Sequence, residues 1–128
     1  MMDRGDLGGG SEEKAILIPL SEFRRERSQL PITFHRKELD QLLDLYGKMV
    51  AAGEWRDYAI DHLSDRAVFS VFRRTSEIPL FQIAKTPKLA RKQGAYSVVA
   101  AGGRILKRGH ELGRVLRMFD KSLRLVKA

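Results

Sequence analysis

The sequence predicts an α+β fold in which an antiparallel sheet of four to five strands packs against two helices, at about 36–52 and 110–126. Three observations lead to this prediction. Two segments carry apolar residues at helical spacing. Between them lie short β-branched and aromatic runs that are separated by turn residues. The chain has 128 residues, of which 43% are apolar, and this is enough for one core without metal or disulfide staples.

Residues 1–29 are expected to form a largely disordered tail, and residues 30–128 a single domain. The tail is polar and contains "GGGS" at 8–11, a composition that buries too little apolar surface to fold. Its exception is the apolar run "AILIPL" at 15–20. Two interpretations of this run remain open: it docks on the domain, or it binds a partner.

The domain begins with "PITFH" (31–35), which reads as a short strand, and continues into the first helix. Gly53 marks the end of that helix. The apolar residues of the helix recur on one face with the spacing i, i+3, i+4, i+7, i+10 and i+11. They are Leu39, Leu42, Leu43, Tyr46, Met49 and Val50.

Five further segments have strand character: 54–63, 67–74, 78–85, 95–101 and 104–109. In the first, alternation places Tyr58, Ile60 and His62 on one face. The opposite face would carry Trp55, Asp57, Ala59 and Asp61. Pro79 puts the third strand at an edge or delays its start. The "GG" at 102–103 predicts a tight turn between the last two strands.

The last helix is predicted from an apolar stripe made by Leu112, Val115, Leu116, Phe119, Leu123 and Val126. On a helical wheel, the opposite side carries Arg114, Arg117, Lys121 and Arg124. We expect a shared core between this helix, the first helix and the sheet. Its predicted members are Leu43, Tyr46, Phe69, Val71, Phe81, Val98, Leu116 and Phe119.

Charge is distributed unevenly along the chain. The net charge is +8 and the isoelectric point is about 10.1. Residues 1–84 carry a net charge of −2, whereas residues 85–128 carry +10 and contain only two acids, Glu111 and Asp120. A cationic surface confined to the last third of a chain favours a polyanionic partner more than uniform basicity would.

The sequence therefore predicts a non-enzymatic binding module, with nucleic acid held through its phosphates as the first hypothesis. An adaptor whose basic face meets an acidic protein surface is the alternative. The odds are about even that the cations only solvate the surface and bind no partner. The aromatic residues of this region, Tyr96 and Phe119, are expected in the core, so base stacking is not favoured. The candidate binding residues are Lys88, Arg91, Lys92, Lys107, Arg108, Arg114, Arg117, Lys121 and Arg124.

Other functional classes find little support. The chain has no cysteine, and His35, His62 and His110 show no metal-ligand spacing. No nucleophile elbow, phosphate-binding loop or dinucleotide fingerprint is present. We therefore expect no cofactor and no metal, and an enzyme ranks third. The longest apolar runs are too short to span a bilayer, and the N-terminus lacks the pattern of a signal peptide. We expect a soluble, cytoplasmic protein, and the oligomeric state stays open.

The segment "PITFHRKELDQLLDLYGKMVAAGEWRDYAIDHLSDRAVFSVFRR", with "PLFQIAKTPKL" and "GRILKRG", resembles a family of small bacterial proteins of unknown function. The resemblance covers about residues 31–128. It implies a small bacterial cytosolic domain and assigns no functional residue. The order of helix, antiparallel sheet and basic last helix is also similar to a double-stranded RNA-binding domain. The chain departs from that pattern in having five strands, and its lysines do not gather at the start of the last helix.

Overall fold

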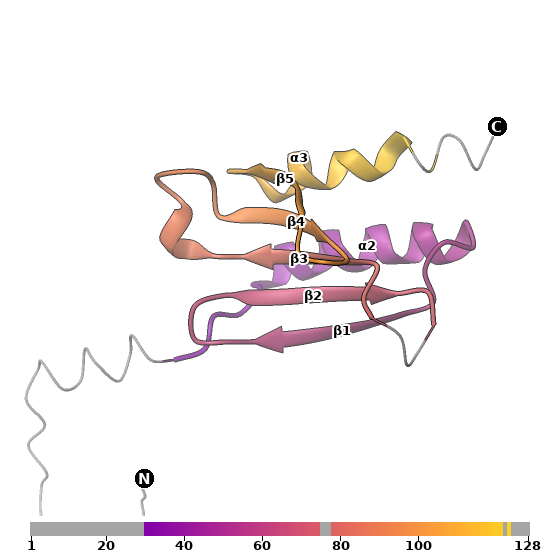
Figure 1. The fold of residues 1–128 in the computed structure, drawn as a ribbon, viewed down its shortest axis with the longest axis horizontal. Helices are drawn as coiled ribbons and strands as arrows, with labels where there is room; N and C mark the ends of the chain where they lie inside the picture. Colours follow the sequence, from indigo (N-terminus) through magenta and orange to yellow (C-terminus); the bar gives the residue numbers. More distant parts are fainter. Residues whose placement is uncertain (1–29, 75–77, 122, 124–128) are drawn as a thin grey trace, which may run out of the picture. The chain divides into compact units, whose positions relative to one another are not determined.

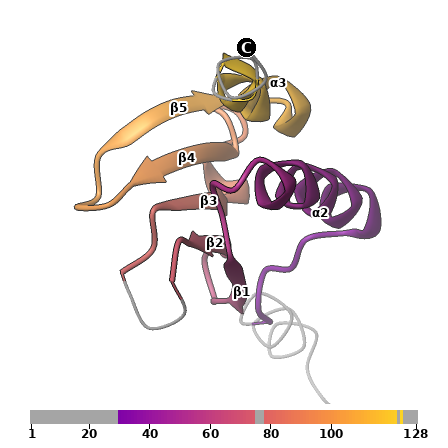
Figure 2. The same ribbon diagram turned by 90° about the vertical axis from the view of Figure 1, so that its right-hand side faces the viewer.

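The computed structural model describes residues 30–74, 78–121 and 123. The predicted tail at 1–29 lies outside the described residues. From Pro31 onward the described residues belong to one compact unit. It is an α+β arrangement with a five-stranded antiparallel sheet, and both helices cover the same face of that sheet (Figures 1 and 2). The predicted fold class is confirmed.

The sheet is a meander, because each strand pairs with its neighbours in the sequence and β1 and β5 form the two edges. Its strands are β1 (Asp57–His62), β2 (Ala67–Phe72), β3 (Phe81–Lys85), β4 (Tyr96–Ala100) and β5 (Ile105–Gly109). The register aligns Ile60, Phe69, Ile83 and Val98 in one row across four strands. This apolar row forms the floor of the core beneath the helices.

The helix α2 (Arg36–Ala51) begins at a reciprocal cap. The ring of His35 accepts a hydrogen bond from the Glu38 N–H, and the Glu38 carboxylate accepts one from the His35 N–H. The helix then buries Leu42, Leu45 and Met49 against the sheet. The boundaries predicted from the sequence agree with these to within one residue.

The last helix is less regular than predicted. α3 spans Leu112–Leu116 and continues as a 3-10 turn, η2 (Arg117–Phe119). Residues three apart eclipse one another in a 3-10 turn, so Phe119 stays on the buried side below Leu116. The helix begins at Leu112, two residues after the predicted start at about 110, because Glu111 is still extended. Residues 122 and 124–128 lie outside the described part of the chain, so the predicted end at 126 is not tested.

Two other local predictions need correction. Residues 31–35 do not form a strand; in the described chain they lead into α2, with the Ile32 N–H donating to the Leu63 carbonyl. Trp55 does not share a strand face with Asp57, as alternation predicted. It precedes β1 and is only 2% exposed, because a turn after α2 folds its indole against Phe119 at 5.2 Å between ring centroids.

The core contains most of its predicted members. Phe69, Val71, Val98, Leu116 and Phe119 are buried, while Tyr46 and Phe81 are partly buried against them. Leu43 was predicted in the core but is 40% exposed. The apolar arc of α2 is wider than the face that packs on the sheet, and Leu42 and Leu45 occupy that face instead. Within the described ranges, neither helix has the length and apolar character to cross a bilayer.

Candidate polyanion-binding surface

The end of β5 and the start of α3 surround a cavity of about 380 Å³. Three of the predicted binding residues line it: Lys107 and Arg108 from β5, and Arg114 from α3. His110 lies between them in the connection. Lys107 and Arg114 are exposed and Arg108 is half-buried. Three cations and one carboxylate, Glu111, thus line one concave site.

The basic loop after β3 lies against this site. It contains a 3-10 turn, η1 (Pro87–Leu89), and returns to β4 through Gly94, whose φ of +101° favours glycine. A Cβ on Gly94 would lie 2.3 Å from the backbone of Gly109, so the loop and the end of β5 touch backbone to backbone. The His110 ring adds a second link, with Nδ1 3.1 Å from the Ala90 carbonyl oxygen. Because a carbonyl only accepts, Nδ1 carries the proton in this contact.

The three cations of that loop are consequently placed beside the cavity. Lys88, Arg91 and Lys92 are all exposed, and they flank Ala90, to which His110 is bonded. Six of the nine predicted residues, from β5, α3 and the loop, therefore gather at one end of the sheet. They are Lys88, Arg91, Lys92, Lys107, Arg108 and Arg114.

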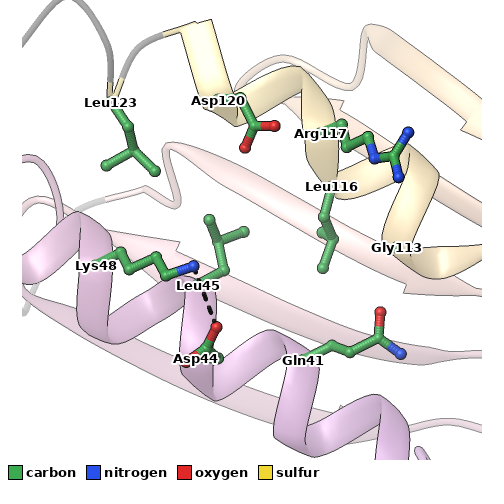
Figure 3. Close-up of a pocket in the computed structure, with 9 residues that line it drawn as sticks. All are labelled: Gln41, Asp44, Leu45, Lys48, Gly113, Leu116, Arg117, Asp120 and Leu123. Atoms are coloured by element: carbon green, nitrogen blue, oxygen red, sulfur yellow. Dashed lines mark ion pairs between the residues drawn. The ribbon is translucent and has the colours of Figure 1, made fainter.

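The helical cations do not all join this group. Arg114 forms an ion pair with Glu111, with 3.0 Å between Nε and Oε1, and both side chains are well exposed. Such a pair contributes little and is readily exchanged for another anion. Arg117 instead lines a separate cavity of about 200 Å³ between α2 and α3. Figure 3 shows Arg117, the first residue of η2, and Asp120, just after η2, across from Asp44 and Lys48 of α2, which form an ion pair.

The remaining two predicted residues lie farther along. Lys121 is exposed after η2, and Arg124 lies outside the described residues. Three of the predicted cations thus line one cavity, and three more lie on the loop that contacts Gly109 and His110 at its rim. Arg117 lines a different cavity with two carboxylates. One surface covering the cavity and the whole outer side of the last helix, as the sequence predicts, stays a prediction.

Lys85, the first cation of the basic region 85–128, stabilises the fold through an ion pair with Glu38. Its Nζ lies 2.8 Å from Glu38 Oε1 and also donates to the Thr33 carbonyl. The Tyr96 hydroxyl donates to the other oxygen of Glu38. The Glu38 side chain is only 3% exposed, so a buried carboxylate joins the start of α2 to β3 and β4. This cluster was missed in the sequence, where "HRKE" at 35–38 has the spacing of a capping box.

The pKa values of this cluster reflect its bonding. Burial alone would raise the pKa of Glu38, but the bonds from Lys85, Tyr96 and the His35 N–H, with the Lys85 charge, together hold it below the ordinary value. Burial, followed by the bond to Glu38 and its charge, raises the pKa of Tyr96 to about 12. The carboxylate is ionised and already satisfied, so we assign the cluster to stability rather than to acid–base catalysis.

The described residues contain no candidate metal site. Among them, no group of three or more His, Asp or Glu side chains could hold a metal ion. His35, His62 and His110 lie at the cap of α2, on β1 and after β5 respectively. Of the two carboxylates on β1, Asp57 accepts a hydrogen bond from the Tyr58 N–H and so protects a strand edge.

The comparison with protein families gives one match. A family model described as "Protein of unknown function (DUF2794)" matches residues 32–116. The chain belongs to this family. The DUF2794 match covers the helix α2, the whole sheet and α3, and it includes the six gathered cations. Arg117, Lys121 and Arg124 lie beyond it. Neither the search of curated proteins nor that of solved structures finds a match for this DUF2794 protein.

Proposed function

We propose that this protein binds a polyanion, and that the ligand is nucleic acid held by its phosphates. The observation that carries the proposal is the cavity that Lys107, Arg108 and Arg114 line together with a single carboxylate, Glu111. Self-repulsion among like charges costs stability, so a fold that gathers them at one site gains most when an anion occupies it. Three of the six cations are arginines, whose planar group suits bidentate phosphate contact.

The cations come from a loop, a strand and a helix, which spreads them over a surface rather than around a single small anion. Phosphate contacts of this kind fix position without reading bases. We therefore expect binding that is independent of sequence and micromolar or weaker at physiological salt.

The aromatic side chains near this surface favour a duplex over a single strand. Binding of single strands relies on exposed aromatic rings that stack on bases. Tyr96 is half-buried and its hydroxyl is bonded to Glu38, while Phe119 is in the core. Neither ring is available as a stacking platform, so a duplex, which presents two phosphate backbones, is the better ligand.

The test is a fluorescence-anisotropy titration of the full chain with duplex DNA, duplex RNA and single strands at low salt. The double variant Arg91→Glu/Lys107→Glu changes one cation on each side of the site and should abolish binding. The matched control is Arg56→Glu/Arg104→Glu. These two exposed arginines precede β1 and β5, at the end of the sheet opposite the cavity. Both pairs lower the net charge equally, so a control that binds like the parent shows that position matters.

Two results would change the proposal. If no nucleic acid binds at low salt, the nucleic-acid reading fails and an acidic protein partner takes its place. If reversal of Arg117 and Lys121 weakens binding as much as reversal in the cavity, the surface extends along the last helix, as the sequence predicts.

A further inference from the structure

The helix α2 carries a second apolar stripe besides the one that packs on the sheet. The buried stripe consists of Leu42, Leu45 and Met49. About a quarter-turn around the helix lies the second stripe, formed by Leu39, Leu43, Tyr46 and Val50. Leu39 and Tyr46 are partly buried against the edge of the core, and Leu43 and Val50 are exposed. Leu43, in the middle of α2, and Val50, in its last turn, keep 40% and 41% of their surface exposed.

The second stripe continues onto the edge strand β1. The rings of Tyr46 and Tyr58 meet edge to face with 4.8 Å between centroids, and Tyr58 is itself 39% exposed. Single exposed apolar residues are ordinary, but a contiguous group marks an interaction site. We call this surface the α2–β1 corner; it consists of Leu39, Leu43, Tyr46, Val50 and Tyr58.

Gly47 borders the corner and has no role in the chain's own packing. A Cβ at this position would meet nothing within 4 Å, and its φ lies outside the region that favours glycine. Glycine inside a helix costs about 1 kcal/mol relative to alanine. A glycine next to an apolar stripe allows another backbone to approach closely.

We propose that the α2–β1 corner binds a second copy of this chain, through antiparallel packing of α2 against the partner's α2 about a two-fold axis. The stripe is spaced 4-3-4, the pattern that helix–helix packing uses. This spacing reads the same in both directions. A two-fold axis therefore sets Leu43 against the partner's Tyr46, and Leu39 against the partner's Val50, twice over.

Pairing of the two β1 edges is the less favourable way to use the same corner. Asp57 and Asp61 put two negative charges on this edge, which discourages strand addition. The carboxylate of Asp57 also accepts a hydrogen bond from the Tyr58 N–H, at 2.8 Å. We therefore expect α2, rather than the β1 edge, to make the contact between the two copies.

The size of the corner sets the strength of the dimer. α2 has 16 residues, which gives a length of about 24 Å. With a helix face about 10 Å wide and the adjoining strand, the footprint is on the order of 400 Å² per chain. A standard interface buries about 800 Å² per partner, so the dimer is weak and forms at high protein concentration.

Charge gives the dimer a distinctive salt response. Each copy carries a net charge of +8, so two copies repel one another. Salt screens that repulsion and strengthens apolar contact, so added salt should favour the dimer. Polyanion binding should respond in the opposite direction. The corner adjoins β1 and the basic cavity adjoins β5, which are opposite edges of the sheet, so the two surfaces can be tested separately.

The experiment is sedimentation velocity of the full chain over a wide range of protein concentration, at low and high salt. The parent should shift from monomer to dimer with concentration, at lower concentration in high salt. Leu43→Lys/Val50→Lys should stay monomeric and still fold, because neither side chain belongs to the buried core. Ile105→Lys, at an apolar residue on β5 that is 50% exposed, is the control and should dimerise nearly like the parent, apart from the effect of one added charge.

Gly47→Ala separates dimerisation from folding. The substitution should make the monomer more resistant to urea, since alanine is the better helix former, and it should weaken self-association at least several-fold by blocking close approach. A chain that remains monomeric at every concentration and salt would overturn the proposal. So would a dimer that the Leu43→Lys/Val50→Lys pair leaves intact.

Discussion

Replacement of Lys85 by methionine tests the buried ion pair that joins α2 to the sheet. Methionine keeps the length of the side chain and its apolar stem, so the substitution removes the charge and leaves little cavity. Glu38 then loses the bond from Nζ at 2.8 Å, while its side chain remains only 3% exposed. A carboxylate without its cation is left in the interior.

The loss in free energy of unfolding depends on which hydrogen bonds Glu38 keeps after the substitution. Breaking a buried ion pair by removing one partner costs about 3–5 kcal/mol, because an uncompensated charge stays buried. Glu38 keeps the hydrogen bonds from the Tyr96 hydroxyl and the His35 N–H. Lys85 itself is 17% exposed, so solvent already screens part of its interaction. We therefore expect the low end of that range, about 3 kcal/mol.

The assay is urea unfolding followed by fluorescence of Trp55, the single tryptophan of the chain, which is buried in the folded state. The midpoint should fall without a change in the slope of the transition. Lys92→Met, at an exposed position in the same basic region, serves as the control and should stay within about 0.5 kcal/mol of the parent.

The pH dependence strengthens this test. The lowered pKa of Glu38 means that the parent gains stability above the ordinary glutamate value and loses it as the pH falls through the folded-state value. Without Lys85 the carboxyl group protonates more easily, so the difference between parent and Lys85→Met should shrink in acid. A loss below about 1 kcal/mol at neutral pH, or a difference that does not shrink, would refute the buried-charge reasoning.

Three further predictions concern the core, the basic loop and alkaline stability. Phe119→Ala should cost about 3–5 kcal/mol in urea unfolding; a parent-like midpoint would mean that the last helix does not bury this face. Gly94→Ala should destabilise by about 3 kcal/mol or more because of both its positive φ and the clash with Gly109, whereas Gly102→Ala, with positive φ but open space, should cost about 1–2 kcal/mol. The contribution of Tyr96 to stability should be fully present below about pH 10 and be lost between about 10 and 12, since the folded state holds the Tyr96 proton; Tyr96→Phe should remove this part of the alkaline loss, while the part from Tyr46, whose pKa burial also raises, should remain.

The strand order was predictable because local signals mark each turn. Gly102 and Gly103, both with positive φ, close the hairpin that "GG" indicates. Pro79 delays the start of β3 to Phe81, one of the two effects expected of it, and β3 is a central strand rather than an edge. These features depend on backbone conformation alone, which the residue type determines.

Side-chain burial was less predictable, because it depends on contacts between distant segments. Periodicity placed Leu43 in the core, but it could not show that the sheet covers only part of the apolar arc of α2. Trp55 was assigned to a strand by alternation, and only the turn after α2 brings it to Phe119. The same limit applies to Glu38, whose burial requires Lys85 and Tyr96 from two other elements.

In the candidate site, too, local features were predictable from the sequence and contacts between distant segments were not. Composition identified the cationic third of the chain, and six of its residues gather near one cavity. Their association depends on the contact of Gly94 with Gly109, which no local pattern indicates. The helical wheel grouped Arg117 with Arg114, but the packing of α3 beside α2 places Arg117 in the groove that Asp44 and Lys48 also line.

The most direct test of the central claim is the salt dependence of binding to duplex DNA by the parent and by Arg91→Gln/Lys107→Gln. Each cation that neutralises a phosphate contributes about −0.9 to the slope of log affinity against log salt. The parent should show a steep negative slope, and the double variant a slope that is shallower by about 1.8. Arg56→Gln/Arg104→Gln should keep the parent slope. Equal slopes for the parent and Arg91→Gln/Lys107→Gln, or an affinity that does not change with salt, would contradict phosphate binding at this site.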